Sequence, residues 1–162
     1  MYRRSEADNR PLGIKDGFRE FMLLQPYWCE IDIFGRPTVY YIPRFYVVNG
    51  ASVPKICWSF GYNPTGELFR PSIPHDFLCE FEGFIHYCDY FGGPPVGVAR
   101  LSSKDTHQLF GYLCKEEQVS FHKRYTAVPA VKNFGPRWSM KDEDSKIKIL
   151  PLEFPEKYTS DK

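Results

Sequence analysis

Apolar and aromatic residues dominate two stretches in the first third of the chain, with a short turn between them. The stretches FREFMLLQPYWCEIDI (18–33) and TVYYIPRFYVV (38–48) each contain one proline, Pro26 and Pro43. Both predict β-strand, and because proline cannot donate a ladder hydrogen bond, each is expected to break or bend there. The intervening FGRP (34–37) predicts a turn. This region therefore predicts a small antiparallel β-unit.

After Asn49 the pattern changes to short helical segments bounded by serine, proline and glycine. Ser52 and Ser72 begin the matching tripeptides SVP and SIP. Serine is a favoured N-cap, and proline is tolerated in the first helical turn. Gly61 and Gly83 follow as stop signals. Two helices are therefore expected, one starting at each serine.

Two further helices are predicted in the second half of the chain. Ser102 and Asp105 have the spacing of a capping box, and the apolar face that follows contains Phe110. His107 lies three residues before Phe110, so it is expected to point toward that face. A last helix is predicted over residues 120–134, kinked or interrupted by Pro129. The fold class expected is α+β, a small N-terminal antiparallel β-unit packed by three to four helices.

The polar and Gly/Pro-rich segments define the expected boundaries. Residues 1–17 predict an extended N-terminal arm, and residues 84–98 predict an aromatic loop rich in glycine and proline. The charged, proline-punctuated residues 141–162 predict a C-terminal tail. A single α+β domain is expected over residues 18–140.

Composition narrows the range of functions. The net charge of the 162 residues is only +1, which does not favour binding to nucleic acid. No apolar run is long enough to cross a bilayer, and no secretory signal is expected at the N-terminus. The five cysteines are scattered without a C-x-x-C pair, which favours reduced thiols and synthesis in a reducing cytoplasm. With 14 Phe and 11 Tyr, the chain suits contact with other proteins.

A succession of four motifs resembles a family from tailed phages and prophages. The motifs are VVNGASVPKICW, IPHDFL, SSKDTHQLF and YTAVPAVKNFGPRW, and the resemblance spans about residues 43–138. In this order they resemble the family catalogued as domain of unknown function 1353. The family pattern has an aspartate before Ala-Ser-Val-Pro, a His-Asp-x-Leu-Tyr helix, and an Ala-Asp helix. This resemblance implies a phage-encoded protein.

The chain departs from that pattern at three polar positions. Asn49 stands where the family has its aspartate before Ala-Ser-Val-Pro, and His107 stands at the Ala-Asp position. Cys79 replaces the tyrosine that follows His-Asp-x-Leu. Only His75 and Asp76 keep the family residues.

The pair His75-Asp76 is the candidate catalytic site. Placed in the first turn of a helix, His75 would be kept neutral by the helix dipole and could act as a base or a metal ligand, with His107 and Asn49 converging on a water or metal ion. A zinc variant would use His75, Cys79 and His107, because residues four apart share a helical face. The alternative is structural, with His75 hydrogen-bonded in the core and Asp76 capping its own helix.

Because three of the polar positions have changed, the first hypothesis is a phage-encoded minor virion structural protein in the tail or neck. It would be part of an oligomeric assembly, would contact other virion proteins, and would need no cofactor. The alternative is a phage hydrolase, with or without a divalent metal, that acts on the host cell envelope or in lysis. In that case His75 would be the base or a ligand, and Asp76 would orient it.

Overall fold

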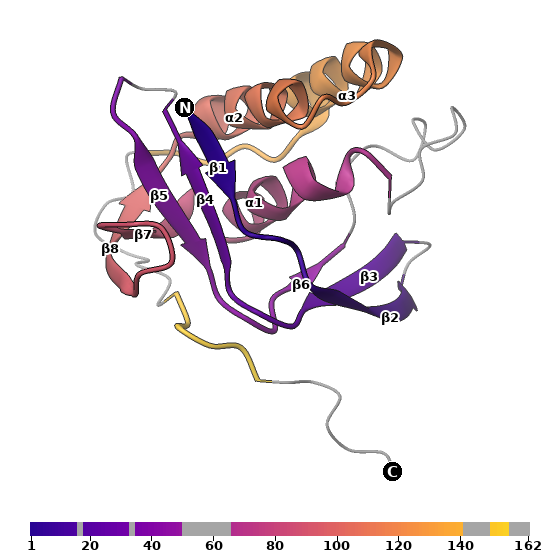
Figure 1. Ribbon diagram of the computed structural model, residues 1–162. Coiled ribbons are helices and arrows are strands. Elements are labelled where there is room, and N and C mark those ends of the chain that lie inside the picture. Colours follow the sequence, from indigo (N-terminus) through magenta and orange to yellow (C-terminus); the bar gives the residue numbers. More distant parts are fainter. Residues whose placement is uncertain (16–17, 33–34, 50–65, 141–149, 156–162) are drawn as a thin grey trace.

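The structure is a computed structural model that describes residues 1–15, 18–32, 35–49, 66–140 and 150–155. The described part of the chain has an α+β fold with two antiparallel sheets and three helices (Figure 1). The strands are β1 (Tyr2–Arg4), β2 (Asn9–Lys15), β3 (Phe18–Leu23), β4 (Tyr27–Ile31), β5 (Thr38–Ile42), β6 (Val47–Val48), β7 (Phe84–Cys88) and β8 (Pro95–Arg100). The helices are α1 (Phe69–Glu80), α2 (Ser103–Glu116) and α3 (Phe121–Phe134).

The two prolines divide the N-terminal strands as the sequence predicts. Pro26 separates β3 from β4, and Pro43 separates β5 from β6. Each proline marks a change of sheet, because β3 and β6 belong to a three-stranded sheet of order β2-β3-β6. β4 and β5 belong to a five-stranded sheet of order β1-β4-β5-β7-β8. The prediction of antiparallel strands is confirmed for this region.

The prediction of a loop over residues 84–98 is wrong, since this segment forms the hairpin β7–β8. Gly92 forms the turn with a φ of 84°, a left-handed conformation that glycine adopts without strain. The flanking strands pair antiparallel, with Tyr87 opposite Gly97. The Gly/Pro signal therefore marked only the turn, and the sheet extends beyond the N-terminal unit that the sequence predicted.

The segment expected as an N-terminal arm is extended, but it is built into both sheets. β1 pairs with β4, and β2 pairs with β3. At β1, Tyr2 and the guanidinium of Arg4 donate hydrogen bonds to the carboxylate of Glu117, just after α2. The side chain of Glu117 is only 9% exposed and that of Arg4 13%. A largely buried ion pair therefore fastens the first strand to the helical layer.

Replacing Glu117 with alanine is expected to lower the free energy of unfolding by about 2–3 kcal/mol, because Arg4 would lose its buried partner. This loss is smaller than the roughly 3–5 kcal/mol typical of breaking a buried ion pair, because Arg4 keeps a contact of 3.3 Å with exposed Glu6. The matched control is Glu30→Ala, which removes the partner of the half-exposed Arg3 and should cost less than about 1 kcal/mol. Urea denaturation of both variants measures the difference, and equal losses would contradict the argument.

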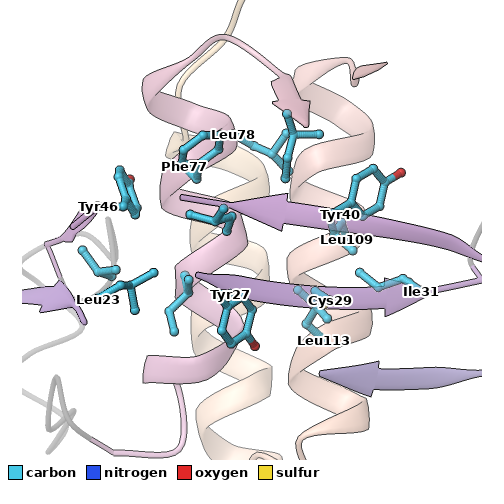
Figure 2. Close-up of a cluster of buried hydrophobic side chains, with 14 of the residues drawn as sticks. Leu23, Tyr27, Cys29, Ile31, Tyr40, Tyr46, Phe77, Leu78, Leu109 and Leu113 are labelled. Atoms are coloured by element: carbon cyan, nitrogen blue, oxygen red, sulfur yellow. The ribbon is translucent and has the colours of Figure 1, made fainter. Parts of the chain in front are cut away.

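The main core lies between the five-stranded sheet and helices α1 and α2 (Figure 2). Along β4, alternate residues are buried, so Tyr27, Cys29 and Ile31 face the helices. α2 contributes Leu109 and Leu113 to the same layer. A second cluster, which includes Phe110 of α2 and Val131 of α3, joins these two helices.

The helix boundaries correct one prediction and confirm two. α1 begins at Phe69, so Ser72 lies inside it, and its hydroxyl donates to the Phe69 carbonyl at 2.7 Å rather than capping the helix. Ser102 does cap α2, accepting from the Asp105 amide at 3.1 Å as the capping box predicts. α3 occupies the predicted range, but it continues through Pro129, so the helix is not interrupted there. The helix predicted to start at Ser52 lies outside the described residues.

Part of the expected C-terminal tail lies on the core. Leu150 is buried, and the ring of Phe154 lies 5.6 Å from that of Tyr46. Within the described residues, no helix has the length and apolar character needed to span a membrane.

Candidate functional site

Helices α1 and α2 bring three of the predicted site residues together. His75 and Cys79 are four residues apart on α1 and therefore share one face, with Sγ of Cys79 3.5 Å from Nε2 of His75. His107 reaches the same point from α2, its Nδ1 atom 3.1 Å from Nε2 of His75. We call His75, Cys79 and His107 the histidine–cysteine cluster.

His75 does not lie in the first turn of its helix, as the sequence predicted. Because α1 begins at Phe69, His75 is in the second turn. The helix dipole acts mainly at the terminal turn, so it does not account for the state of this ring. The expected self-capping role of Asp76 is wrong for the same reason.

Burial governs the protonation of His107. The side chains of His75 and His107 are nearly inaccessible, each residue 1% exposed, and the ring of Phe110 lies 4.9 Å from that of His75. Desolvation, followed by the nearby His75, lowers the pKa of His107 from its ordinary value. His107 is therefore a neutral imidazole at neutral pH.

A chain of hydrogen bonds fixes which nitrogen of each ring carries a proton. Nε2 of His107 lies 3.0 Å from the Pro136 carbonyl oxygen, which can only accept, so this nitrogen bears the hydrogen. Nδ1 of the neutral His107 then has a lone pair and accepts from Nε2–H of His75. A neutral His75 is left with its lone pair on Nδ1. We call this Pro136–His107–His75 chain the histidine relay.

Asp76 lies beside the free nitrogen of the relay. The residue is buried, and its Oδ1 atom is 3.7 Å from Nδ1 of His75. This separation is too long for a direct hydrogen bond but short enough for a carboxylate to stabilise a protonated imidazole. Asp76 is thus placed to respond to a change in the charge of His75.

An open hollow of about 290 Å³ adjoins the cluster. Asn49 lines it together with Asp76 and Cys79, so the structure brings Asn49 to the site by way of the hollow. The other lining residues are Tyr46, Glu80 and Pro136. Solvent can therefore approach the cluster from the side of Cys79.

Sequence reasoning missed the last three of these residues. Glu80 follows Asp76 by four positions, so helical spacing could have identified it. Tyr46 carries a pKa raised well above its usual range, first by burial and then by the charge of Asp76, and no motif marks it. Pro136 acts through its backbone carbonyl, which leaves no signal in residue type.

Gly135 permits the close approach of His107 to the end of α3. A β-carbon at this position would lie 2.4 Å from the Val131 carbonyl oxygen and 2.6 Å from Cε1 of His107. Gly135→Ala is therefore expected to displace the His107 ring and lower the free energy of unfolding by about 1–3 kcal/mol. Imidazole NMR resonances of His75 and His107, with urea denaturation, measure both effects.

The control for this change is Gly111→Ala in α2. There the new β-carbon would meet only the Val128 side chain, at 3.1 Å. Alanine also has a higher helix propensity than glycine. Stability is expected to change by less than about 1 kcal/mol, and the histidine resonances should stay in place. Unshifted resonances in the Gly135 variant would contradict the proposed crowding.

Comparison with known proteins places the chain in a family. Residues 21–131 match the family described as Protein of unknown function (DUF1353), and this range includes every member of the histidine–cysteine cluster. No curated protein and no solved structure matches the chain. The match covers more than half of the sequence. The chain therefore belongs to the DUF1353 family.

Proposed function

We propose that this protein is a hydrolase in which His75 is the general base. The observation that supports this most strongly is the histidine relay, which gives His75 a single tautomer with its lone pair on Nδ1. The sequence favoured a virion protein because three polar positions of the family pattern are changed, and one of them is the aspartate that His107 replaces. In the relay, however, His107 accepts from Nε2 of His75, which is the orienting task that an aspartate performs in other sites.

The proposed reaction is attack of water on an ester or amide carbonyl. Asp76 and Cys79 lie 3.7 and 3.9 Å from Nδ1 of His75, and both line the hollow. A water molecule in the hollow gives a proton to Nδ1, and its oxygen attacks the carbonyl carbon. The imidazolium, stabilised by Asp76, then returns the proton to the leaving group. The thiol of Cys79 is a weak nucleophile here, because burial raises its pKa to about 12.

The substrate class in this proposal is a component of the host cell envelope. The motif resemblance to phage and prophage proteins supports an action on the envelope or in lysis. The open, polar-lined hollow suits one end of an extended substrate better than an enclosed small molecule.

The test is an assay of purified protein on isolated peptidoglycan and on phospholipid vesicles, with a chelator and with added divalent ions. His75→Ala is expected to lower kcat/KM by about 100- to 10,000-fold, the typical contribution of a general base to the rate. The control is His122→Ala, which removes an exposed histidine of α3 outside the cluster. Equal activity of the His75 variant and the wild type would reject the proposal, as would inactivity of the wild type on both substrates.

A second candidate function is a minor virion component in the tail or neck. One observation favours it: the rings of Phe121 and Tyr125 stack 5.8 Å apart on the outside of α3, each 72% exposed, and Phe134 is 79% exposed. Exposed aromatic side chains are frequent anchors of protein interfaces. In this proposal the partners are other phage proteins, and the chain is located in the particle.

Mass spectrometry of purified particles tests the second candidate. The protein is expected in mature particles at a fixed ratio to a known tail component. Its presence in the lysate but not in the particles would exclude a structural role in the virion. The hydrolase would then remain as the proposed function.

A further inference from the structure

We infer that the histidine–cysteine cluster is a binding site for one zinc ion. Its ligand atoms would be Nε2 of His75, Nδ1 of His107 and Sγ of Cys79. The inference does not depend on the hydrolase proposal, because it concerns binding and is tested without an activity assay.

The spacing of the three atoms is the first argument. Tetrahedral zinc with Zn–N near 2.0–2.1 Å and Zn–S near 2.3 Å places two nitrogens about 3.3 Å apart and a nitrogen and a sulfur about 3.6 Å apart. The corresponding separations from His75 are 3.1 Å to His107 and 3.5 Å to Cys79. All three ligand atoms lie within 4.8 Å of one another. The widest gap therefore needs to close by only roughly 1 Å.

The second argument concerns the nitrogens that point away from the cluster. Zinc-bound histidines usually donate their other N–H to a carbonyl or carboxylate, which fixes the ring and raises its basicity. Nε2–H of His107 already donates to the Pro136 carbonyl, leaving Nδ1 free for the metal. Nδ1 of His75 has Asp76 as its neighbouring carboxylate, at 3.7 Å. His107 thus has its acceptor in place, while Asp76 would have to move closer to Nδ1 of His75 by a few tenths of an ångström to accept a hydrogen bond.

The chemical type of the three ligands favours zinc over magnesium and calcium. One thiolate and two imidazoles suit zinc, whereas magnesium and calcium prefer oxygen ligands. Burial, followed by the charge of Asp76, raises the pKa of Cys79 to about 12, so the metal must displace the thiol proton on binding. The neighbouring hollow leaves room for a fourth ligand from solvent.

Zinc also changes the proton arrangement of the relay. Coordination through Nε2 of His75 removes the hydrogen that His107 accepts, and the ring then carries its proton on Nδ1. The metal-bound His75 therefore cannot act as the general base. Metal binding and the histidine relay are alternative states of the same residues.

The test uses the full chain, freed of metal by a chelator and titrated with Co²⁺ as a spectroscopic substitute for zinc. We expect one equivalent to produce the visible bands of four-coordinate cobalt and a thiolate-to-cobalt charge-transfer band, and zinc to displace it. Cys79→Ser is expected to lose the charge-transfer band, and His107→Ala to bind cobalt about 100-fold or more weakly. Cys57→Ala, a cysteine outside the described residues, should keep every band.

Stability measurements keep the test valid where a variant is poorly folded. Zinc should raise the thermal midpoint of the wild type and not that of Cys79→Ser, a change of a single atom whose fold is checked by circular dichroism. Binding of less than one equivalent by the wild type would overturn the inference. So would a charge-transfer band that is lost in Cys57→Ala and retained in Cys79→Ser.

Discussion

Phe77→Ala is expected to lower the free energy of unfolding by about 4 kcal/mol, the typical cost of emptying a buried phenylalanine site. Phe77 is fully buried in the C-terminal half of α1, within the main core (Figure 2). Its ring lies 5.0 Å from that of Tyr46, nearly perpendicular to it, and 4.7 Å from that of Phe81. The surrounding backbone is a helix and a sheet, so the cavity cannot easily collapse.

The thermal midpoint should fall by about 10 °C or more, since 1 kcal/mol shifts a chain of this size by about 2–4 °C. Calorimetry and urea denaturation measure the change. The matched control is Phe121→Ala, the same substitution at a position of α3 that is 72% exposed, where the expected change is within about 0.5 kcal/mol. Similar losses at both positions would mean that the helix layer does not pack as described.

The N-terminal strands could be predicted because their signals are local. Pro26 and Pro43 interrupt apolar runs, and each one separates strands that belong to different sheets. The hairpin of residues 84–100 was missed because its glycines and prolines outweighed the short strands around them. Its first strand, β7, is stabilised by pairing with β5, a contact between residues far apart in sequence. Local composition does not predict such a long-range contact.

At the start of α1, a local signal predicted a helix boundary that tertiary packing overrides. Ser72 and Pro74 have the order of a cap and a first turn, yet α1 begins at Phe69. Phe69 is buried, and its ring lies 5.2 Å from that of Phe21 in β3. Tertiary packing of this apolar residue outweighs the local preference of serine for a cap.

The candidate site was predictable in its residue types but not in its contacts. Helical spacing alone puts His75 and Cys79 on one face, and the apolar pattern of α2 directs His107 inward. The 3.1 Å contact between the two histidines depends on how α1 packs on α2, which no local pattern encodes. The sequence therefore gave weight to the three changed polar positions, and it could not show that His107 contacts Nε2 of His75.

Gly83→Ala is the second change with a large expected effect, a loss of about 3 kcal/mol or more. Gly83 has a φ of 89°, and a β-carbon there would lie 1.9 Å from the Leu101 carbonyl oxygen and 2.9 Å from Nε1 of Trp138. Its own amide donates to Leu78 at 2.7 Å, and its carbonyl accepts from Leu101 at 2.9 Å. Since the Leu101 carbonyl also accepts from Trp138, a side chain at position 83 would disturb the exit from α1 and the approach to α2 together.

Gly92→Ala separates the two causes of that loss. Gly92 has a nearly equal φ of 84°, but a β-carbon there would meet nothing within 4 Å. It should therefore cost only the left-handed backbone strain, about 1–2 kcal/mol. The difference between the two variants in urea denaturation measures the crowding against Leu101, and the near-ultraviolet circular dichroism of Trp138 should change only in the Gly83 variant. Equal losses would mean that the Leu101 carbonyl moves aside freely. The end of α1, which carries Cys79, would then be held less rigidly than its hydrogen bonds imply.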